Sequence, residues 1–315
     1  MPSTLVIYNP IAGRGRVKTE WSQVEHSLHA AGVDFDAVAT SGPLDATRLA
    51  REACKKYTTV VGVGGDGTLH EIVNGLLQAS GEGETITLGI IPLGNGDDFA
   101  KMIPPETPVG GRPFDWHTAV QKIARGQTQL FDACRMLGDH LRPELGDGPH
   151  YFLNVIDVGF GAHTNQAFTT QPKFLKGMAA YMAAILVTMI NYPVVHLRIQ
   201  LDDGVPFEQS TTMTAVANGR CFGNGFWVCP DAKADDGLFD LMVAQAVNRL
   251  TILRLIPKFT KGTHTAEPVL RMLRARRVVL DSDAPLIVEA DGEVPYLETH
   301  HLELEILPKK LRIIV

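Results

Sequence analysis

Short apolar runs alternate with helical patterns along the first part of the chain. Four such runs predict strands, at residues 5–8, 35–40, 60–63 and 86–92. Two segments between them are compatible with helices, at residues 17–31 and 46–56, and a third has apolar residues at helical spacing, namely Leu69, Ile72, Val73, Leu76 and Leu77. Strands that alternate with helices in this way are typical of an α/β fold with a parallel sheet.

The pattern changes in the second part of the chain. A Pro- and Gly-rich stretch, MIPPETPVGGRPFD, predicts a loop, and beyond about Leu130 strand-like runs dominate. These runs lie at residues 151–155, 196–201, 212–217, 238–243, 278–281, 286–290 and 302–307, with helical patterns left at 177–190 and 250–261. We therefore expect an α/β domain over residues 1–130 and a mainly antiparallel β domain over residues 131–308. The tail, residues 309–315, is expected to return to the first domain as a strand.

Composition narrows the class of protein. The 315 residues exceed what one hydrophobic core usually holds, which also favours two domains. A hydrophobic content of 45% is ordinary for a globular protein, and a net charge of −6 argues against nucleic-acid binding. Four scattered cysteines form no CxxC pair and no secretory signal precedes the first strand, so a reduced, cytoplasmic protein is expected.

The longest apolar run covers residues 178–190. It is shorter than the roughly 20 residues that a membrane-spanning helix needs. We interpret it as a helix, and a buried position is favoured over contact with lipid. In the second alternative, the preceding Lys173 and Lys176 would suit a membrane surface.

Three glycine-rich turns follow three of the predicted strands. They are NPIAGRGR, VGGDGT and LGNGDD. Because the carboxyl ends of parallel strands share one sheet edge, these turns are expected to meet there. Exposed backbone N–H groups and helix N-termini favour anions, so the turns predict a polyphosphate site. Gly62, Gly64 and Gly67 match G-x-G-x-x-G, but outside the first βαβ unit, and the Walker A pattern is absent.

Two acidic residues in the second of these turns have competing interpretations. Asp66 would repel phosphates unless a cation intervened, so we interpret it as orienting Mg²⁺ or its waters, with a plain turn aspartate as the alternative. Thr68 and Glu71 form T-x-x-E, a capping-box pattern, so a purely structural role for Glu71 stays open.

Acidic residues also gather at two places in the second half. CPDAKADDGLFDL covers residues 229–241, and ADGE covers residues 290–293. Oxygen-rich loops suit Mg²⁺ or Ca²⁺. An Asp-Gly pair between strands is also a plain hairpin signal, and the spacing alone favours a hairpin in both places.

Taken together, these motifs resemble the diacylglycerol kinase catalytic family, in particular the bacterial soluble lipid kinases related to sphingosine kinases. The resemblance runs in order along nearly the whole chain, and GGDGTLHE is its most specific motif. The other matching segments are NPIAGRG, TSGPLDA, PLGNGDDFAK, NVIDVGFGA, GMAAYM, NGRCFGNGFWVCPDAKADDGLFDL and DGE.

The resemblance implies an α/β nucleotide-binding domain with a parallel sheet, a second, mainly antiparallel β-sandwich-like domain, and an active site in the cleft. Glu293 would be the general base for a lipid hydroxyl, and Asp66 and Asp98 would organise the catalytic Mg²⁺. Contacts to ATP would come from Asn9, Pro10, Ala12, Gly13, Thr40, Gly65, Asp66, Gly67, Thr68, Glu71 and Asn95.

The resemblance also implies a second, structural Mg²⁺. Asp236 would bind it, together with the backbone oxygens of Lys233 and Leu238. Two positions depart from the family pattern PLGTxNDFAR, because the threonine is Asn95 and the asparagine is Asp97. Asn95 can still donate to a phosphate. Asp97 could pair with a basic residue, recruit metal or weaken ATP binding.

The sequence therefore predicts a kinase that transfers the γ-phosphate of ATP to a lipid hydroxyl. NAD kinases share the GGDGT turn and are the first alternative. A non-catalytic nucleotide- or lipid-binding protein is the second, and an NAD(P)-dependent oxidoreductase is supported only by G-x-G-x-x-G. The substrate class implies transient contact of a cytoplasmic protein with the membrane surface. The identity of the lipid and a homodimer stay open.

Overall fold

The computed structural model describes residues 2–146, 148–169, 177–191, 194–223 and 225–315. Its first domain has four parallel strands in the order β2-β1-β3-β4. These are β1 (Thr4–Tyr8), β2 (Phe35–Ala39), β3 (Thr59–Gly64) and β4 (Thr87–Pro92). The connecting helices are α1 (Ala12–Ala30), α2 (Asp45–Ala53), α3 (Asp66–Ser80) and α4 (Trp116–Arg125).

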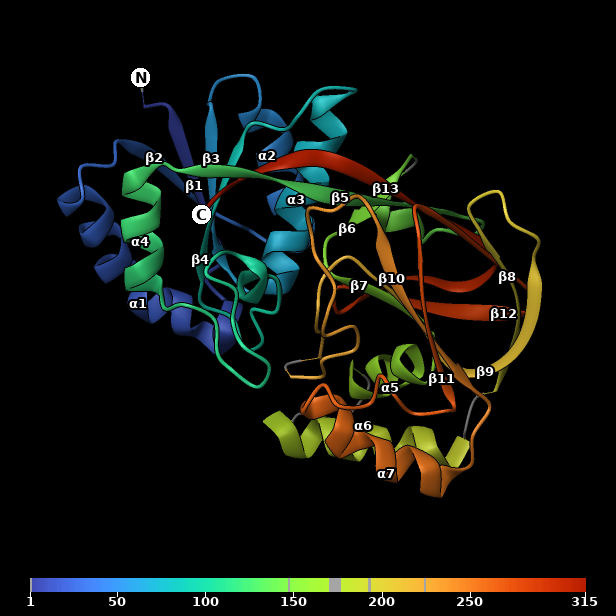
Figure 1. The fold of residues 1–315 in the computed structure, drawn as a ribbon. Coiled ribbons are helices and arrows are strands. Elements are labelled where there is room, and N and C mark those ends of the chain that lie inside the picture. The colour runs from blue at the N-terminus through green and yellow to red at the C-terminus, as the bar shows by residue number, and fades with distance from the viewer. Residues whose placement is uncertain (1, 147, 170–176, 192–193, 224) are drawn as a thin grey trace.

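The helices cover both faces of this sheet (Figure 1). Successive residues of a strand point to opposite faces, so each strand supplies two cores. Leu5 and Ile7 pack with α2 and α3, whereas Val6 packs with α1 and α4. A sheet buried on both sides explains why its strands are almost continuously apolar.

The second domain is β-rich, and the strand pairings within it are antiparallel. Its strands are β5 (Thr128–Gly138), β6 (His150–Phe152), β7 (Val155–Gly159), β8 (Val195–Leu201), β9 (Phe207–Ala217), β10 (Phe239–Gln245), β11 (Leu270–Ala275), β12 (Arg277–Ala290) and β13 (Glu293–Ile314). Its helices are α5 (Phe160–Thr169), α6 (Gly177–Asn191) and α7 (Arg249–Thr260), which gather at one end of the domain (Figure 1).

Two long strands join the domains. Figure 1 shows β5 and β13 running side by side from the first domain into the second. Near its end β13 pairs in parallel with β4, at Ile313 and Leu88. The hydrogen-bonded path of strands therefore continues from one domain into the other. We retain a boundary near residue 130, with the tail returning to the first domain, as a proposal.

Several elements differ from the sequence prediction. The predicted strands at 278–281 and 286–290 are one strand, β12, whose pairing with β13 shifts register between them. Helix α4 was not predicted, although Trp116, Ala119, Val120 and Ile123 are buried at helical spacing and Asp115 caps its first turn. The prediction missed β5, β11 and α5 as well.

Helix α6 is not the buried helix that was favoured for the longest apolar run. Ile185 and Met189 are buried, whereas Leu186, Val187 and Ile190 are exposed. The helix therefore has one covered face and one apolar face at the surface. Lys173 and Lys176 lie outside the described residues, and among the residues that are described no helix is both long and apolar enough to cross a membrane.

The packing of α2 against α3 predicts a steric effect of substitution at Gly75. A methyl group there would lie 2.2 Å from the Thr47 carbonyl oxygen. Alanine favours a helix by about 1 kcal/mol relative to glycine, but this overlap outweighs that gain. We expect Gly75→Ala to lower the free energy of unfolding in urea by about 1–3 kcal/mol. Gly42→Ala, where a methyl group meets open space, is the control; a stabilised Gly75→Ala would contradict the packing.

Candidate active site

The three glycine turns meet at the carboxyl edge of the parallel sheet. A methyl group on Gly13 would lie 2.2 Å from the Leu93 carbonyl oxygen, and one on Gly94 would lie 2.4 Å from the Gly65 Cα atom. These turns therefore touch through backbone atoms, which only glycine allows. Gly13 also has φ +59°, in the left-handed region.

Side-chain contacts tie the first two turns together. The Asn9 amide donates to the Thr68 hydroxyl over 3.0 Å, and its oxygen accepts from the Ile11 backbone N–H over 3.2 Å. Asn9 thus connects the end of β1 to the start of α3. The predicted meeting of the turns is present in the structure.

A cleft of ≈ 1870 Å³, part of it open to solvent, lies between these turns and the second domain. The first domain lines it with Asn9, Ile11, Ala12, Gly13, Arg14, Gly65, Asp66, Gly67, Thr68, Leu69, Glu71, Gly94, Asn95, Gly96, Asp98 and Phe99. The second domain lines it with Leu153, Asn154, Asn165, Phe168, Phe222, Gly223, Asp291, Gly292 and Glu293. Of the predicted ATP contacts, Pro10 and Thr40 are not among the lining residues.

Two carboxylates converge beside Gly96. A methyl group on Gly96 would lie 3.0 Å from Asp66 Oδ2 and 3.4 Å from Asp98 Oδ2. Burial and the charge of Asp98 raise the pKa of Asp66 well above its usual value. Lys101 forms a buried ion pair with Asp98. Ionising Asp66 therefore costs free energy, which a nearby cation would offset. Two converging carboxylates are a donor set that suits Mg²⁺.

Asp97 is turned back into its own loop. Both carboxylate oxygens accept from the Gly94 backbone N–H, over 2.9 and 3.1 Å, and φ is +48°. Burial raises its pKa to about 6. These bonds give Asp97 a role that was not among those predicted, an internal support of the turn, and Arg16 and Lys101 lie near enough to act on its charge. Asn95 is exposed.

Glu293 reaches across the cleft from the second domain. It follows the two-residue turn Asp291–Gly292 between β12 and β13, in which Ala290 pairs with Glu293. The hairpin predicted for ADGE is therefore confirmed. A methyl group on Gly67 would lie 3.4 Å from Glu293 Oε1, so this carboxylate stands at the N-terminus of α3. The Asn165 amide of α5 supports the turn by donating to the Gly292 carbonyl over 2.8 Å.

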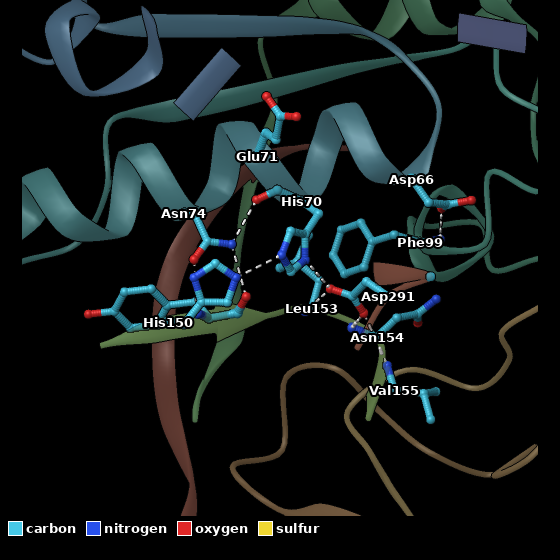
Figure 2. A network of polar contacts seen from close by, with 12 residues as sticks. Asp66, His70, Glu71, Asn74, Phe99, His150, Leu153, Asn154, Val155 and Asp291 are labelled. Carbon is cyan, nitrogen blue, oxygen red and sulfur yellow. Dashed lines mark hydrogen bonds and ion pairs between the residues drawn. The ribbon is translucent and has the colours of Figure 1, made fainter. Parts of the chain in front are cut away.

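Asp291 is an anchor for this turn. Its carboxylate accepts from the backbone N–H groups of Leu153, Asn154 and Val155, over 2.7, 2.8 and 3.2 Å (Figure 2). His70 of α3 lies 3.0 Å from the same carboxylate. Four donors around one buried carboxylate hold it in a fixed place.

The contacts of His70 were missed by the sequence analysis. His70 Nε2 lies 3.2 Å from His150 Nε2 of β6, so the ring has a polar partner at each nitrogen (Figure 2). Burial alone would lower the pKa of His70, but the hydrogen bond and charge of Asp291 raise it. Burial, then the neighbouring His70, lowers the pKa of His150 to about 3. The only sequence signal was that His70 lies one helical turn after Asp66.

Glu71 does not form the capping box that the T-x-x-E pattern left open as one interpretation. Helix α3 begins at Asp66, and Glu71 instead accepts from the Ala46 backbone N–H at the start of α2, over 3.1 Å. It thus caps the neighbouring helix. Burial raises the pKa of Glu71. In Figure 2 its side chain points away from the network around His70.

The acidic loop before β10 lies between β9 and β10, which pair antiparallel with Asp240 opposite Ala217. Residues 218–238 join the two strands, so the connection is a long loop and not the tight Asp-Gly turn of a short hairpin. Asp236 forms an ion pair with Arg274, which also lies 3.3 Å from Asp240. The Leu238 backbone N–H donates to Asp236 over 3.2 Å. In the described part of the chain, no three His, Cys, Asp or Glu side chains are grouped so as to hold a metal ion. Arg274 supplies the positive charge beside Asp236 here.

A buried carboxyl pair lies behind the Asp291–Gly292 turn. Asp157 of β7 and Glu289 of β12 are directly opposite each other on neighbouring antiparallel strands. The Gly292 backbone N–H donates to Glu289. Burial raises the pKa of Asp157 to about 8, although the nearby Ala162 N–H lowers it slightly. Burial and the charge of Asp157 raise the pKa of Glu289. At neutral pH at least one proton is therefore held between them.

This pair predicts a pH dependence of stability. A carboxyl group whose pKa is raised on folding binds a proton in the folded state that the unfolded state has lost. The free energy of unfolding therefore falls as the pH rises toward 8, by at most about 1.4 kcal/mol per pH unit for one group. Asp157→Asn removes this loss. Its stability in urea relative to the native chain should grow from pH 5 to pH 8 and level off above; a constant difference would contradict the assignment.

Comparison with known proteins agrees with this geometry. Residues 3–136 match the diacylglycerol kinase catalytic domain, and residues 154–315 match the YegS C-terminal NAD kinase beta sandwich-like domain. A diacylglycerol kinase of Bacillus subtilis (strain 168) is 28% identical over 296 residues, which cover 93% of this chain and 90% of the relative. The expected two-domain architecture with a β-sandwich-like second domain is thereby confirmed.

Solved structures show the same fold. A diacylglycerol kinase from Bacillus anthracis str. Sterne has a TM-score of 0.71 at 22% identity, with 99% of this chain and 96% of that one covered. An NAD kinase from Archaeoglobus fulgidus in complex with ATP has a TM-score of 0.51 at 12% identity, with 99% and 93% covered. The second domain match alone spans more than half of the chain, and the first covers the remaining domain. The chain therefore belongs to the diacylglycerol kinase catalytic-domain family, with a YegS-type C-terminal domain, and is a phosphotransferase with an alcohol group as acceptor.

Proposed function

We propose that the chain is a lipid kinase that transfers the γ-phosphate of Mg-ATP to a lipid hydroxyl in the cleft between its domains. One observation carries the proposal. The carboxylate of Glu293, from the second domain, stands at the N-terminus of α3, where the glycine turns of the first domain meet. A candidate base thus faces a candidate phosphate site.

The glycine turns have the features of a triphosphate site. They bring exposed backbone N–H groups to the start of a helix, where partial positive charge favours anions. The exposed Asn95 amide can donate to a phosphate oxygen. We propose that ATP lies along these turns, with its ribose end toward Thr40. The Thr40 backbone N–H donates to the Tyr8 carbonyl, so Thr40 lies at the same edge of the sheet.

Asp66 and Asp98 would hold the catalytic Mg²⁺, because their carboxylates converge beside Gly96. Bound there, the ion would neutralise charge that develops between the β- and γ-phosphates. We keep a structural Mg²⁺ at Asp236 and the carbonyls of Lys233 and Leu238 as a proposal. It requires Arg274 to leave the Asp236 carboxylate.

The chemical step is then an in-line displacement. Glu293 accepts the proton of the lipid hydroxyl, and the oxygen attacks the γ-phosphorus. A new oxygen–phosphorus bond forms as the bond to the β-phosphate oxygen breaks, and ADP leaves with that electron pair. A positioned base of this kind contributes roughly 10²–10⁴-fold to the rate.

An apolar pocket supports a lipid acceptor. It encloses ≈ 680 Å³, part of it open to solvent, between β9, β10 and the helices α5, α6 and α7. Its lining includes Met213, Met242, Ile252 and Leu255. Phe222 lines both this pocket and the cleft, so the two are neighbours. We propose that acyl chains enter the pocket while the hydroxyl lies in the cleft.

The exposed apolar face of α6 suits transient contact of a cytoplasmic protein with a membrane surface, which we keep as part of the proposal.

The likeness of the fold to an NAD kinase makes NAD the competing acceptor. A homodimer stays open.

The direct test is transfer of labelled γ-phosphate from Mg-ATP to mixed lipid vesicles, with NAD in a parallel tube. We expect label in an organic-extractable product. Glu293→Gln should lower kcat by about 10²–10⁴-fold while ATP still binds, because only the base is lost. Glu298→Gln, an exposed glutamate on the same strand, is the matched control. Label in the NAD product alone would make the chain an NAD kinase, and no label in either tube would favour a non-catalytic binding protein.

The acyl pocket makes a second prediction. Val247 lines it at a half-buried position, so Val247→Phe can fill the pocket with little strain. Each methylene excluded from an apolar site costs about 0.8 kcal/mol, so displacing two should raise the KM for a long-chain lipid about tenfold. The KM for ATP should not change. Val205→Phe, at a side chain that is 91% exposed, is the control; an unchanged lipid KM would contradict the pocket.

A further inference from the structure

The orientation of Glu293 depends on how the preceding turn is held. Asp291 and Gly292 are both in the left-handed region, with φ of +52° and +93°, and form a tight two-residue turn. Since one glycine separates Asp291 from Glu293, an anchor at Asp291 also sets where the Glu293 carboxylate points. The Asp291 carboxylate is buried, with 5% of its side chain exposed.

The anchor has two sources. Three of its donors are backbone N–H groups of residues 153–155, which belong to the same domain as the turn. His70 is the donor from the first domain: an ionised carboxylate can only accept, so the Nδ1 that faces it must carry the proton. This contact joins residues 221 positions apart in the sequence.

Helix α3 links this contact to the phosphate site. Asp66 begins the helix, and His70 lies four residues later, so both stand on one side of its first turns. The Glu293 carboxylate meets the helix between them, beside Gly67. The His70–Asp291 contact therefore lies on the same helix as Asp66 and Gly67, and it ties this helix to the turn that carries Glu293.

His70 is itself held rigidly. Its second ring nitrogen faces His150 over 3.2 Å, and 6% of its side chain is exposed. One turn further along α3, the Asn74 amide donates to the Tyr151 carbonyl, and the Tyr151 N–H donates back to Asn74, both over 2.9 Å. Figure 2 shows these contacts along one side of the helix, facing the second domain.

We propose that His70 is a positioning residue for phosphoryl transfer, which acts by holding the Asp291–Gly292 turn against α3 so that Glu293 points at the phosphate site. The proposal rests on the proposed kinase function. A histidine that merely fills the core would stabilise the fold without affecting the chemical step, so the test must separate the two roles.

Two substitutions at His70 make that separation. Asparagine carries an amide nitrogen at the same number of bonds from Cα as Nδ1, so His70→Asn keeps a donor for Asp291 and loses the contact with His150. His70→Leu loses both. A misplacement of about 1 Å in a catalytic group costs roughly 10²-fold in rate. His29→Leu, a histidine of the same domain that stacks on Phe35, is the control.

In the lipid phosphorylation assay, we expect His70→Leu to lower kcat by about 10–100-fold with the KM for ATP within about twofold of the native value. His70→Asn should restore kcat to within about threefold of native, and His29→Leu should leave it unchanged. The proposal is overturned if His70→Leu keeps native kcat, if only the KM for ATP rises, or if His70→Asn is as impaired as His70→Leu.

A spectroscopic readout keeps the proposal testable if a variant does not fold or the chain phosphorylates another acceptor. In the native full chain labelled with ¹⁵N at histidine, the His70 Nδ1–H should give a slowly exchanging NMR signal. Asp291→Asn should shift this signal upfield, since the charged acceptor is lost. A signal that is absent, or unchanged in Asp291→Asn, overturns the contact regardless of the outcome of the kinase assay.

Discussion

The direct backbone contact between two glycine turns is the constraint on which the cleft depends. Gly65 and Gly94 approach so closely that a single methyl group would collide with the opposite Cα atom. This contact brings the start of α3 against the turn that carries Asn95 and Asp98. Any side chain at either glycine would separate the carboxylates that converge beside Gly96, and the proposed phosphate site would widen.

Crowded carboxylates are the second feature of the site. Burial and mutual repulsion raise the pKa of Asp66, and burial raises that of Asp97 to about 6. Such a cluster is unfavourable for folding at neutral pH unless positive charge offsets it. Lys101 offsets part of it at Asp98. We infer that a divalent cation and the bound substrate complete the balance. The crowding that lowers the stability of the ligand-free protein would then stabilise the protein with these ligands bound.

The sequence was sufficient to predict that the glycine turns meet and insufficient to predict their coupling to the second domain. The meeting of the glycine turns follows from a general rule, because parallel strands end at one edge. The His70–Asp291 contact joins residues 221 positions apart, and no local pattern predicts it. The capping pattern at Thr68 was present but misleading, since α3 already begins at Asp66 and Glu71 accepts from the Ala46 N–H at the start of α2. Likewise, no spacing rule could reveal that Arg274 of β11 would pair with Asp236.

The central claim is that nucleotide and base face each other across the cleft. A crystal structure of the chain with Mg²⁺ and a non-hydrolysable ATP analogue tests it most directly. The account predicts the triphosphate along residues 65–68 and 94–96, with the terminal phosphate on the side of Glu293 and the metal between Asp66 and Asp98. A nucleotide bound outside this cleft, or a terminal phosphate directed away from Glu293, would contradict it.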